Sequence, residues 1–161
     1  MWGQFSKSDM SFFSNIKKIV NLKLKGPKFE IHITLTGPLL KYTKEKKSIL
    51  KQLSLKTKSF NLNTQNYDLK DAKYTALFIK IKKSKKLIDL KNKLENKLKI
   101  ISSDYCPHIS LYYGTKKKEK KIKVIELLPK LPKKIILKNL CLVDYDETIN
   151  KWKILEKFSL V

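Results

Sequence analysis

The chain contains two histidines, His32 and His108, and both occur in the same short pattern. Residues 32–35 read His-Ile-Thr-Leu and residues 108–111 read His-Ile-Ser-Leu, so a hydroxyl side chain follows each imidazole two positions later. Residues i and i+2 of a β-strand project from the same face, which would place each imidazole beside its hydroxyl. The repeat therefore predicts two equivalent strands that contribute to one composite site.

Two imidazoles can divide the proton transfers of a phosphoester cleavage near neutral pH, because their ordinary pKa is about 6.5. We expect His108 to take a proton from water as the base and His32 to protonate the departing alkoxide as the acid. Thr34 and Ser110 can donate hydrogen bonds to non-bridging phosphate oxygens. This scheme needs neither a metal nor another cofactor. The alternative, in which both histidines are ordinary polar residues of half-buried strands, does not predict a repeat.

Hydrophobic periodicity predicts the elements that position these residues. The predicted helices are 8–20, one that follows a cap at Thr43, one capped by Ser84 and a lysine-rich one that ends before Pro129; the predicted strands are 29–35, 59–67, 74–81, 108–112, 135–145 and 152–160. An apolar-striped helix precedes the histidine strand in both halves. This order predicts an α+β fold in which two lobes of a single domain, residues 1–161, face one another.

The charge of the chain comes from lysine alone. All 37 basic residues are lysine and the formal net charge is +23, while 42% of the residues are hydrophobic, which is enough for a real core and excludes disorder. The lysines either coat an ordinary surface or form a footprint for nucleic acid or membrane. Lysine clusters at 44–47, 80–86 and 116–121 lack interleaved aromatics, so they do not predict base stacking. A positive field would still attract phosphorylated ligands.

The sequence shows no secretory leader and no apolar run of membrane-spanning length, so we expect a cytoplasmic protein without a membrane partner. Cys106 and Cys141 lack a CxxC spacing and are expected to be free thiols in a reducing compartment. Cys106 precedes His108 by two residues, but no base stands at a diagnostic position for a cysteine nucleophile. We therefore expect it to be a buried, inert thiol.

The paired His-x-Thr/Ser strands resemble the two-histidine (2H) phosphoesterase superfamily. Residues 29–36 (Phe-Glu-Ile-His-Ile-Thr-Leu-Thr) and 105–114 (Tyr-Cys-Pro-His-Ile-Ser-Leu-Tyr-Tyr-Gly) look most like its cyclic phosphodiesterase branch. The resemblance implies two pseudo-symmetric lobes, each an antiparallel sheet with helices on its outer face, around a central cleft. It further implies metal-independent hydrolysis of nucleoside 2′,3′-cyclic phosphates or of ADP-ribose 1″,2″-cyclic phosphate, by a monomer without an obligate protein partner.

Carried over by position, His32, Thr34, His108 and Ser110 correspond to the catalytic and phosphate-binding set, and Tyr113 matches an aromatic that contacts the ligand in relatives. Strict alternation would turn Tyr113 away from His108, so its role requires a bend before Gly114. Trp2, in a plausible first strand, could stack on a nucleobase or ribose, or could cover the edge of the core. These six residues and no metal ligand form the predicted site.

Other functions remain open on the sequence alone. The RNA 2′,5′-ligase-like branch has paired motifs too, but an arginine typically follows its second copy, and this chain has no arginine. The protein could instead be a 2H enzyme that acts on 2′,5′-linked RNA, RNA ends or cyclic (di)nucleotides. Each of these substrates would present the same phosphate to the same two histidines. A catalytically idle module that binds RNA or nucleotides would keep the cleft and use its lysines for phosphate contact.

Overall fold

The computed structural model describes residues 1–37, 43–101 and 104–161 of the chain. Within this part the helices are α1 (Lys7–Leu24), α2 (Lys44–Leu55), α3 (Lys85–Leu98), α4 (Lys118–Ile125) and the short 3-10 helix η1 (Ile149–Lys151); the strands are β1 (Trp2–Phe5), β2 (Ile33–Thr34), β3 (Phe60–Leu69), β4 (Leu77–Ile81), β5 (His108–Tyr112), β6 (Lys134–Asp144) and β7 (Lys153–Ser159). The predicted α+β order is confirmed.

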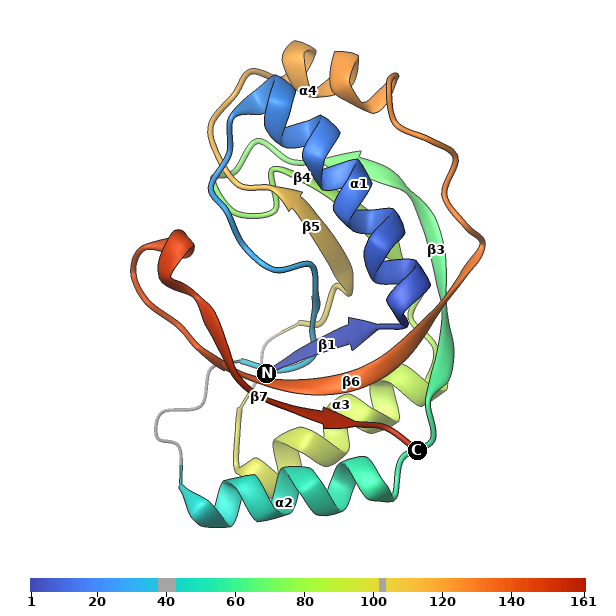
Figure 1. The fold of residues 1–161 in the computed structure, drawn as a ribbon, viewed down its shortest axis with the longest axis vertical. Helices are drawn as coiled ribbons and strands as arrows, with labels where there is room; N and C mark the ends of the chain where they lie inside the picture. The colour runs from blue at the N-terminus through green and yellow to red at the C-terminus, as the bar shows by residue number, and fades with distance from the viewer. Residues whose placement is uncertain (38–42, 102–103) are drawn as a thin grey trace.

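The seven described strands form one antiparallel sheet with the order β1-β2-β5-β4-β3-β6-β7. The long strand β6 pairs with β3 through residues 134–137 and with β1 through residues 137–141, so the pairing also links both ends of the row β1-β2-β5-β4-β3. The sheet curves strongly as a result (Figure 1). The two halves of the sequence therefore share one sheet, in which β2, directly after His32, pairs with β5, which begins at His108.

Alternation along the strands separates two faces of this sheet. Odd-numbered residues of β2, β4 and β5, such as Ile33, Ile79 and Ile109, belong to the main hydrophobic core. Thr34, Phe78, Lys80, His108 and Ser110 alternate with them and lie on the other face, as does His32 directly before β2. Tyr112 is an exception, because the pairing of β4 with β5 shifts between Leu77 and Phe78 and Tyr112 belongs to the core. A second, smaller apolar cluster on that face contains Trp2, Cys141 and Val143. One face of the sheet thus packs on the main core, and the other face carries the residues of the predicted site.

The helices cover the core face at two ends of the molecule. α1 packs on β5 and α4, while α2 packs on α3, β6 and β7, and Figure 1 shows the two groups on opposite sides of β6. Side-chain caps begin three helices, since Ser6, Thr43 and Ser84 each accept a hydrogen bond from a backbone N–H of the first turn. The caps predicted at Thr43 and Ser84 are confirmed, whereas α1, predicted over 8–20, has its cap at Ser6 and runs from Lys7 to Leu24.

Some boundaries differ from the periodicity. β2 contains only Ile33 and Thr34, because residues 29–32 have no ladder partner in the described part of the chain, and β4 begins at Leu77 instead of Tyr74. The predicted hairpin of 135–145 and 152–160 is present as β6 and β7. In the described part of the chain, no helix has both the length and the apolar character needed to cross a bilayer.

Candidate functional site

The register between β2 and β5 places the two histidine motifs side by side. Ile33 pairs with Ile109, and in antiparallel register this sets His32 opposite Ser110 and Thr34 opposite His108. All four even-numbered side chains therefore share one face. Directly opposed Cβ atoms lie about 5 Å apart and diagonal ones about 7–8 Å. The two imidazoles are the diagonal pair, so a single phosphate can fit between them.

Both imidazoles are anchored in the same way. Nδ1 of His32 lies 2.7 Å from the carbonyl oxygen of Glu30, and Nδ1 of His108 lies 2.8 Å from that of Cys106. In each case the carbonyl belongs to the residue two positions earlier, so Nδ1 carries the proton and donates it. Nε2 of each neutral ring then holds a free lone pair. Neither Nε2 makes a hydrogen bond within the described residues, which leaves both available for proton transfer.

Burial keeps His32 neutral. Its side chain is 4% exposed, and desolvation lowers its pKa to about 3, although the Glu30 carbonyl opposes this shift. The positive charges of Lys17 and of a protonated His108 lower the pKa further. The mutual repulsion of the two imidazoles is the electrostatic sign of their proximity. At neutral pH and without a ligand, the His32 imidazole is therefore unprotonated at Nε2.

His108 is more accessible than His32. Burial lowers its pKa as well, the Cys106 carbonyl opposes this, and the nearby ammonium of Lys70 lowers it again. The ring of Phe78 packs edge-on against it with the centroids 5.4 Å apart. Phe78 is the cross-strand partner of Ser110 in β4, so the same face continues from the histidines into that strand. Because water reaches His108, it can take up a proton more easily than His32.

The position of Trp2 does not fit a residue that stacks on a ligand. The indole is fully buried, and its face stacks on the His32 imidazole with 3.6 Å between centroids and 8° between planes. A ligand cannot reach that face, so the expectation that Trp2 stacks on a nucleobase or ribose is corrected. Trp2 instead holds the ring of His32 in place. The alternative interpretation of Trp2 as a buried packing residue is the better one.

Tyr113 turns to the site by the expected bend. β5 ends at Tyr112, and Gly114 follows with φ +150°, a conformation that side chains rarely adopt. A Cβ on Gly114 would also lie 2.2 Å from the Tyr112 hydroxyl. Tyr113 consequently packs on Phe29, with centroids 4.3 Å apart. Burial raises the pKa of Tyr113, and a hydrogen bond with the Ser110 side chain partly opposes this rise.

Sequence reasoning missed the aromatic residues around Tyr113. Its ring also contacts Tyr74 and Trp152, and Trp152 contacts Tyr145. These rings come from segments far apart in the sequence, so no local pattern connects them. Their shared signal is only that the chain places aromatics at the ends of predicted strands.

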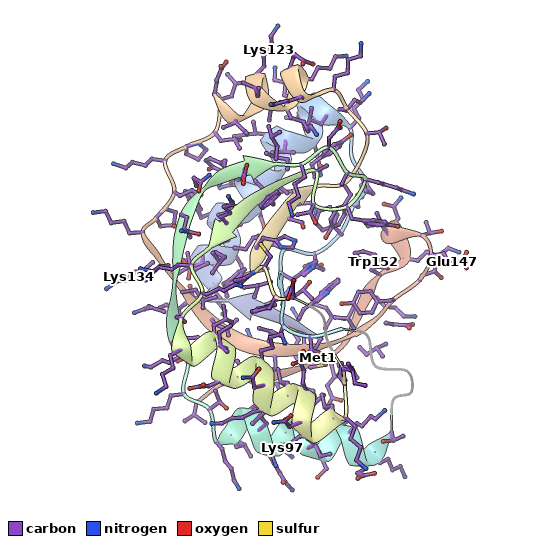
Figure 2. The ribbon with its side chains drawn as sticks, turned by 180° about the vertical axis from the view of Figure 1, so that it is seen from behind. Met1, Lys97, Lys123, Lys134, Glu147 and Trp152 are labelled. Atoms are coloured by element: carbon purple, nitrogen blue, oxygen red, sulfur yellow. The ribbon has the colours of Figure 1, made fainter. Side chains whose placement is uncertain are left out.

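The cysteines and most lysines lie outside the site. Cys106 is exposed, which corrects the expectation of a buried thiol, because only its backbone carbonyl faces His108. Lysine side chains point outward around the molecule, and Figure 2 shows Lys97, Lys123 and Lys134 at three separate edges. This distribution fits a general lysine coat better than one nucleic-acid footprint.

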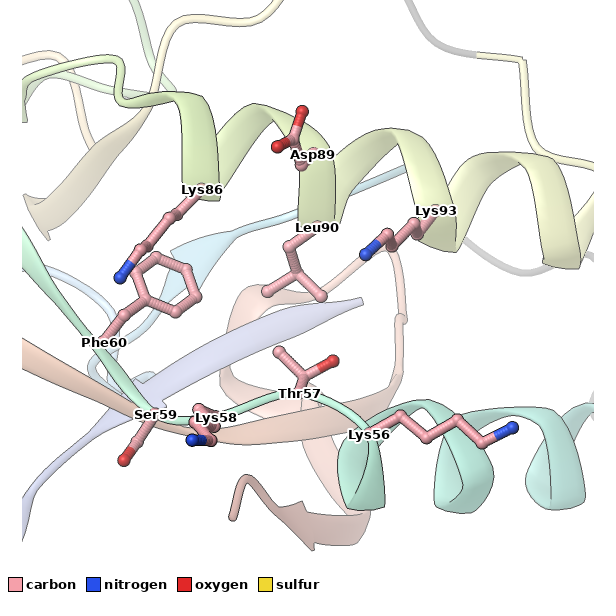
Figure 3. Close-up of a pocket in the computed structure, with 9 residues that line it drawn as sticks. All are labelled: Lys56, Thr57, Lys58, Ser59, Phe60, Lys86, Asp89, Leu90 and Lys93. Carbon is pink, nitrogen blue, oxygen red and sulfur yellow. The ribbon is translucent and has the colours of Figure 1, made fainter.

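Two cavities differ in their relation to the site. One of about 300 Å³ lies between α3 and the segment 56–60, where the side chain of Lys93 extends towards Leu90 and Thr57 (Figure 3). None of the residues that line it belongs to the predicted site. Another of about 410 Å³ borders the site at Tyr113 and Gly114 and is also lined by residues 147–150 of the β6–β7 connection. Asn150 Oδ1 accepts a 2.7 Å hydrogen bond from the Lys28 N–H and ties this connection to the segment before β2.

Known proteins share this arrangement of elements. TT0787 of Thermus thermophilus has a TM-score of 0.64 and 16% identity, with 99% of this chain and 96% of that chain covered. A structure described as a phosphoesterase has a TM-score of 0.61 and 14% identity, with 99% and 95% covered. LigT of E. coli, in a complex with 3′-AMP, has a TM-score of 0.57 and 14% identity, with 99% and 95% covered. No curated protein matches the sequence.

A family model provides the sequence evidence. The model of the 2′-5′ RNA ligase superfamily matches residues 20–149, which include both histidine motifs and most of the chain. The superfamily to which the histidine motifs pointed is thereby confirmed, and the structural neighbours have the same fold. The chain belongs to the 2′-5′ RNA ligase superfamily of 2H phosphoesterases.

Proposed function

We propose that this phosphoesterase-type protein is a metal-independent cyclic phosphodiesterase. It opens a nucleoside 2′,3′-cyclic phosphate, or ADP-ribose 1″,2″-cyclic phosphate, to a phosphomonoester. The observation that carries the proposal is the pairing of Ile33 with Ile109, which brings two carbonyl-anchored imidazoles onto one face with their Nε2 atoms free. A monomer in the cytoplasm remains the expected form of the enzyme.

The environments of the two histidines favour an assignment opposite to the one expected from sequence. His32 is the more deeply buried and stays neutral, so it acts as the base that takes a proton from water. His108 is reached by solvent, so it acts as the acid that protonates the leaving oxygen. The water oxygen forms a bond to phosphorus, the ring P–O bond breaks, and the two histidines exchange their protonation states.

The hydroxyls of Thr34 and Ser110 act on the phosphate. Ser110 stands opposite His32 and Thr34 opposite His108, so each hydroxyl can donate to a non-bridging oxygen while the imidazoles occupy the other diagonal. This chain has no arginine that could clamp the phosphate from both sides. The two hydroxyls and the two imidazoles are therefore the groups that stabilise the negative charge of the phosphate in the transition state. The complexes of LigT with 3′-AMP and with phosphate are consistent with a phosphomonoester product bound in this fold.

A 2′,5′-phosphodiesterase or an enzyme that processes RNA ends is the second candidate. The family model, named for 2′-5′ RNA ligases, favours it, since it matches the segment that carries both motifs. Both candidates require the same four groups. They differ only in whether the bond that breaks lies in a five-membered ring or between two nucleosides.

The test is a substrate panel with product regiochemistry read by phosphorus NMR. The panel contains 2′,3′-cyclic nucleotides, ADP-ribose 1″,2″-cyclic phosphate, 2′,5′-oligoadenylate and cyclic dinucleotides. We expect turnover of the first two, unaffected by EDTA, and a fall of about 10²–10⁴-fold in kcat for His32→Ala and for His108→Ala. Full activity in either variant contradicts the two-histidine mechanism, and turnover of 2′,5′-oligoadenylate alone selects the second candidate.

The pH profile tests the assignment of acid and base. The acid His108 must carry a proton, and its pKa lies below the ordinary 6.5, so kcat/KM should already be falling before the rising pH reaches 6.5. On the acid side, kcat/KM should fall only near the low pKa of His32. An optimum above pH 7.5 would contradict the assignment.

Binding with a steep salt dependence but no turnover of any member of the panel would indicate an idle binding module.

A further inference from the structure

The site is bordered by different chemistry on its two sides. Beside His32 the wall is aromatic, with Trp2 and Trp152 6.1 Å apart between centroids. Beyond His108 the same face of the sheet carries the charged side chains of β4 and the end of β3. Of these, Lys80 stands opposite His108, but its Nζ lies 2.7 Å from the carboxylate of Asp68. This ion pair leaves little charge for a ligand.

Lys70 lies near the same carboxylate without forming an ion pair. Its charge helps to lower the pKa of Asp68, but it makes no ion pair within the described residues, and its side chain is exposed. Asp68 pairs with Phe78 and the Lys70 N–H donates to the carbonyl of Ala76, so Lys70 shares the face of Asp68 and Phe78. Two strand spacings, about 10 Å, separate its backbone from β5. A lysine side chain covers much of that distance.

Ring contacts place the Lys70 ammonium near the reaction centre. Its Nζ is 6.0 Å from the centroid of Phe78, and the Phe78 ring is in edge contact with His108. The charge of Lys70 also acts on His108, whose pKa it lowers. The Phe78 ring therefore lies between the Lys70 ammonium and His108, on the side of the site opposite Trp2 and Trp152.

A buried lysine holds this segment in place. The side chain of Lys121 in α4 is 1% exposed, and its Nζ donates a 2.8 Å hydrogen bond to the carbonyl of Lys70. Burial of an ammonium is costly, so this contact is a built feature and not a chance surface encounter. It limits the movement of the Lys70 backbone relative to the sheet.

We propose that Lys70 forms a second anion subsite, which binds a phosphate other than the one that is cleaved. The inference rests on the proposed function, because it presumes that the scissile phosphate lies between the two histidines. A cyclic mononucleotide has one phosphate and leaves Lys70 without a ligand. Two kinds of substrate offer a second phosphate on this side: an RNA strand that ends in a cyclic phosphate, through its next phosphodiester, and ADP-ribose 1″,2″-cyclic phosphate, through its pyrophosphate.

Turnover of three cyclic substrates distinguishes these sources. We expect kcat/KM for a cyclic mononucleotide to be at least tenfold below that for a dinucleotide ending in a 2′,3′-cyclic phosphate, for ADP-ribose 1″,2″-cyclic phosphate, or for both. In Lys70→Gln this advantage should disappear. Because the variant also removes a charge that lowers the pKa of His108, the quantity to compare is the ratio of the two kcat/KM values, measured at one pH. The substrate that loses the advantage is the source of the second phosphate.

Binding provides a readout that does not depend on turnover. We expect adenosine 3′,5′-bisphosphate to bind the wild-type protein about tenfold more tightly than adenosine 3′-monophosphate in calorimetry, with a steeper dependence on salt. Lys70→Gln should make the two affinities equal. If the wild type turns over none of the cyclic substrates, the proposed function fails, but the affinity difference still decides whether the subsite exists.

Two lysine variants serve as controls. Lys134, at the start of β6, is exposed at a far edge of the molecule (Figure 2), so Lys134→Gln should change neither affinity. Lys73 lines the cavity on the other side, next to Tyr113. Equal wild-type affinities for the two adenosine ligands, an equal loss for both in Lys70→Gln, or a selective loss in Lys73→Gln instead would each overturn the proposal.

Discussion

Lowering the pH from 7.5 to 5.0 is expected to reduce the stability of the fold by about 2 kcal/mol through His32 alone. In the folded protein burial lowers its pKa to about 3, whereas the unfolded chain restores the ordinary value of about 6.5. Between these values the unfolded state binds a proton that the folded state does not. The free energy of unfolding therefore falls as the pH drops below 6.5, by about 1.4 kcal/mol for each pH unit.

The size of the effect at pH 5.0 follows from the 1.5 units below the unfolded pKa, about 2 kcal/mol. It hardly depends on how low the folded pKa is, because any value below about 4 leaves His32 neutral at pH 5.0. The full contribution is present above pH 6.5. It is lost progressively down to about pH 3, where the folded state takes up the proton as well.

Urea unfolding at the two pH values measures this contribution. Wild type and His32→Gln are compared, since glutamine cannot titrate but keeps a polar side chain beside Trp2. The wild type should lose about 2 kcal/mol more than the variant between pH 7.5 and 5.0. His108→Gln is the matched control, and its difference should be smaller because solvent reaches that imidazole. Equal losses in wild type and His32→Gln would refute the argument that His32 is buried in its neutral form.

Three further predictions concern the surroundings of the site. Gly114→Ala should lower the free energy of unfolding by at least about 1 kcal/mol in urea melts, because φ of Gly114 is +150°. A Cβ on Gly37 would have its nearest neighbour at 3.8 Å, so Gly37→Ala should change the free energy of unfolding by no more than about 0.5 kcal/mol. Similar effects of the two substitutions would contradict this reasoning. A thiol reagent at pH 8 should modify only the exposed Cys106 in the native protein, since burial raises the pKa of Cys141 to about 12, and rapid modification of both thiols before urea is added would argue against this burial. Ser110→Ala should lower kcat about 10-fold or more with little change in stability, and an unchanged kcat would remove the serine from the phosphate site.

Local sequence patterns were sufficient to predict the helices and strands in their order and to single out the candidate site residues. The caps at Thr43 and Ser84 and the apolar stripe of α3 depend on neighbours within a few positions, and the structure contains them as predicted. The boundaries of β2 and β4 were wrong by several residues, because a strand extends only as far as its partner. That partner lies elsewhere in the sequence and leaves no local signal.

The repeat of the histidine motif already indicated a site with two imidazoles and two hydroxyls on one face. Which strand lies beside which, however, is a property of long-range pairing. The sequence predicted two lobes, and only the structure shows that β6 joins them into one sheet with Ile33 against Ile109. The diagonal arrangement of His32 and His108 follows from that register and from nothing local.

The sequence by itself determined the order of the elements, the two histidine motifs and the superfamily, because each depends on residue types and on spacings of a few positions. The tertiary structure decided how each group is surrounded. It buried Trp2 against His32, turned the Cys106 side chain to solvent and placed the Lys70 ammonium near the Phe78 ring beyond His108. Desolvation and charge act through space, so the proton affinities that separate His32 from His108 arise only when distant strands pair.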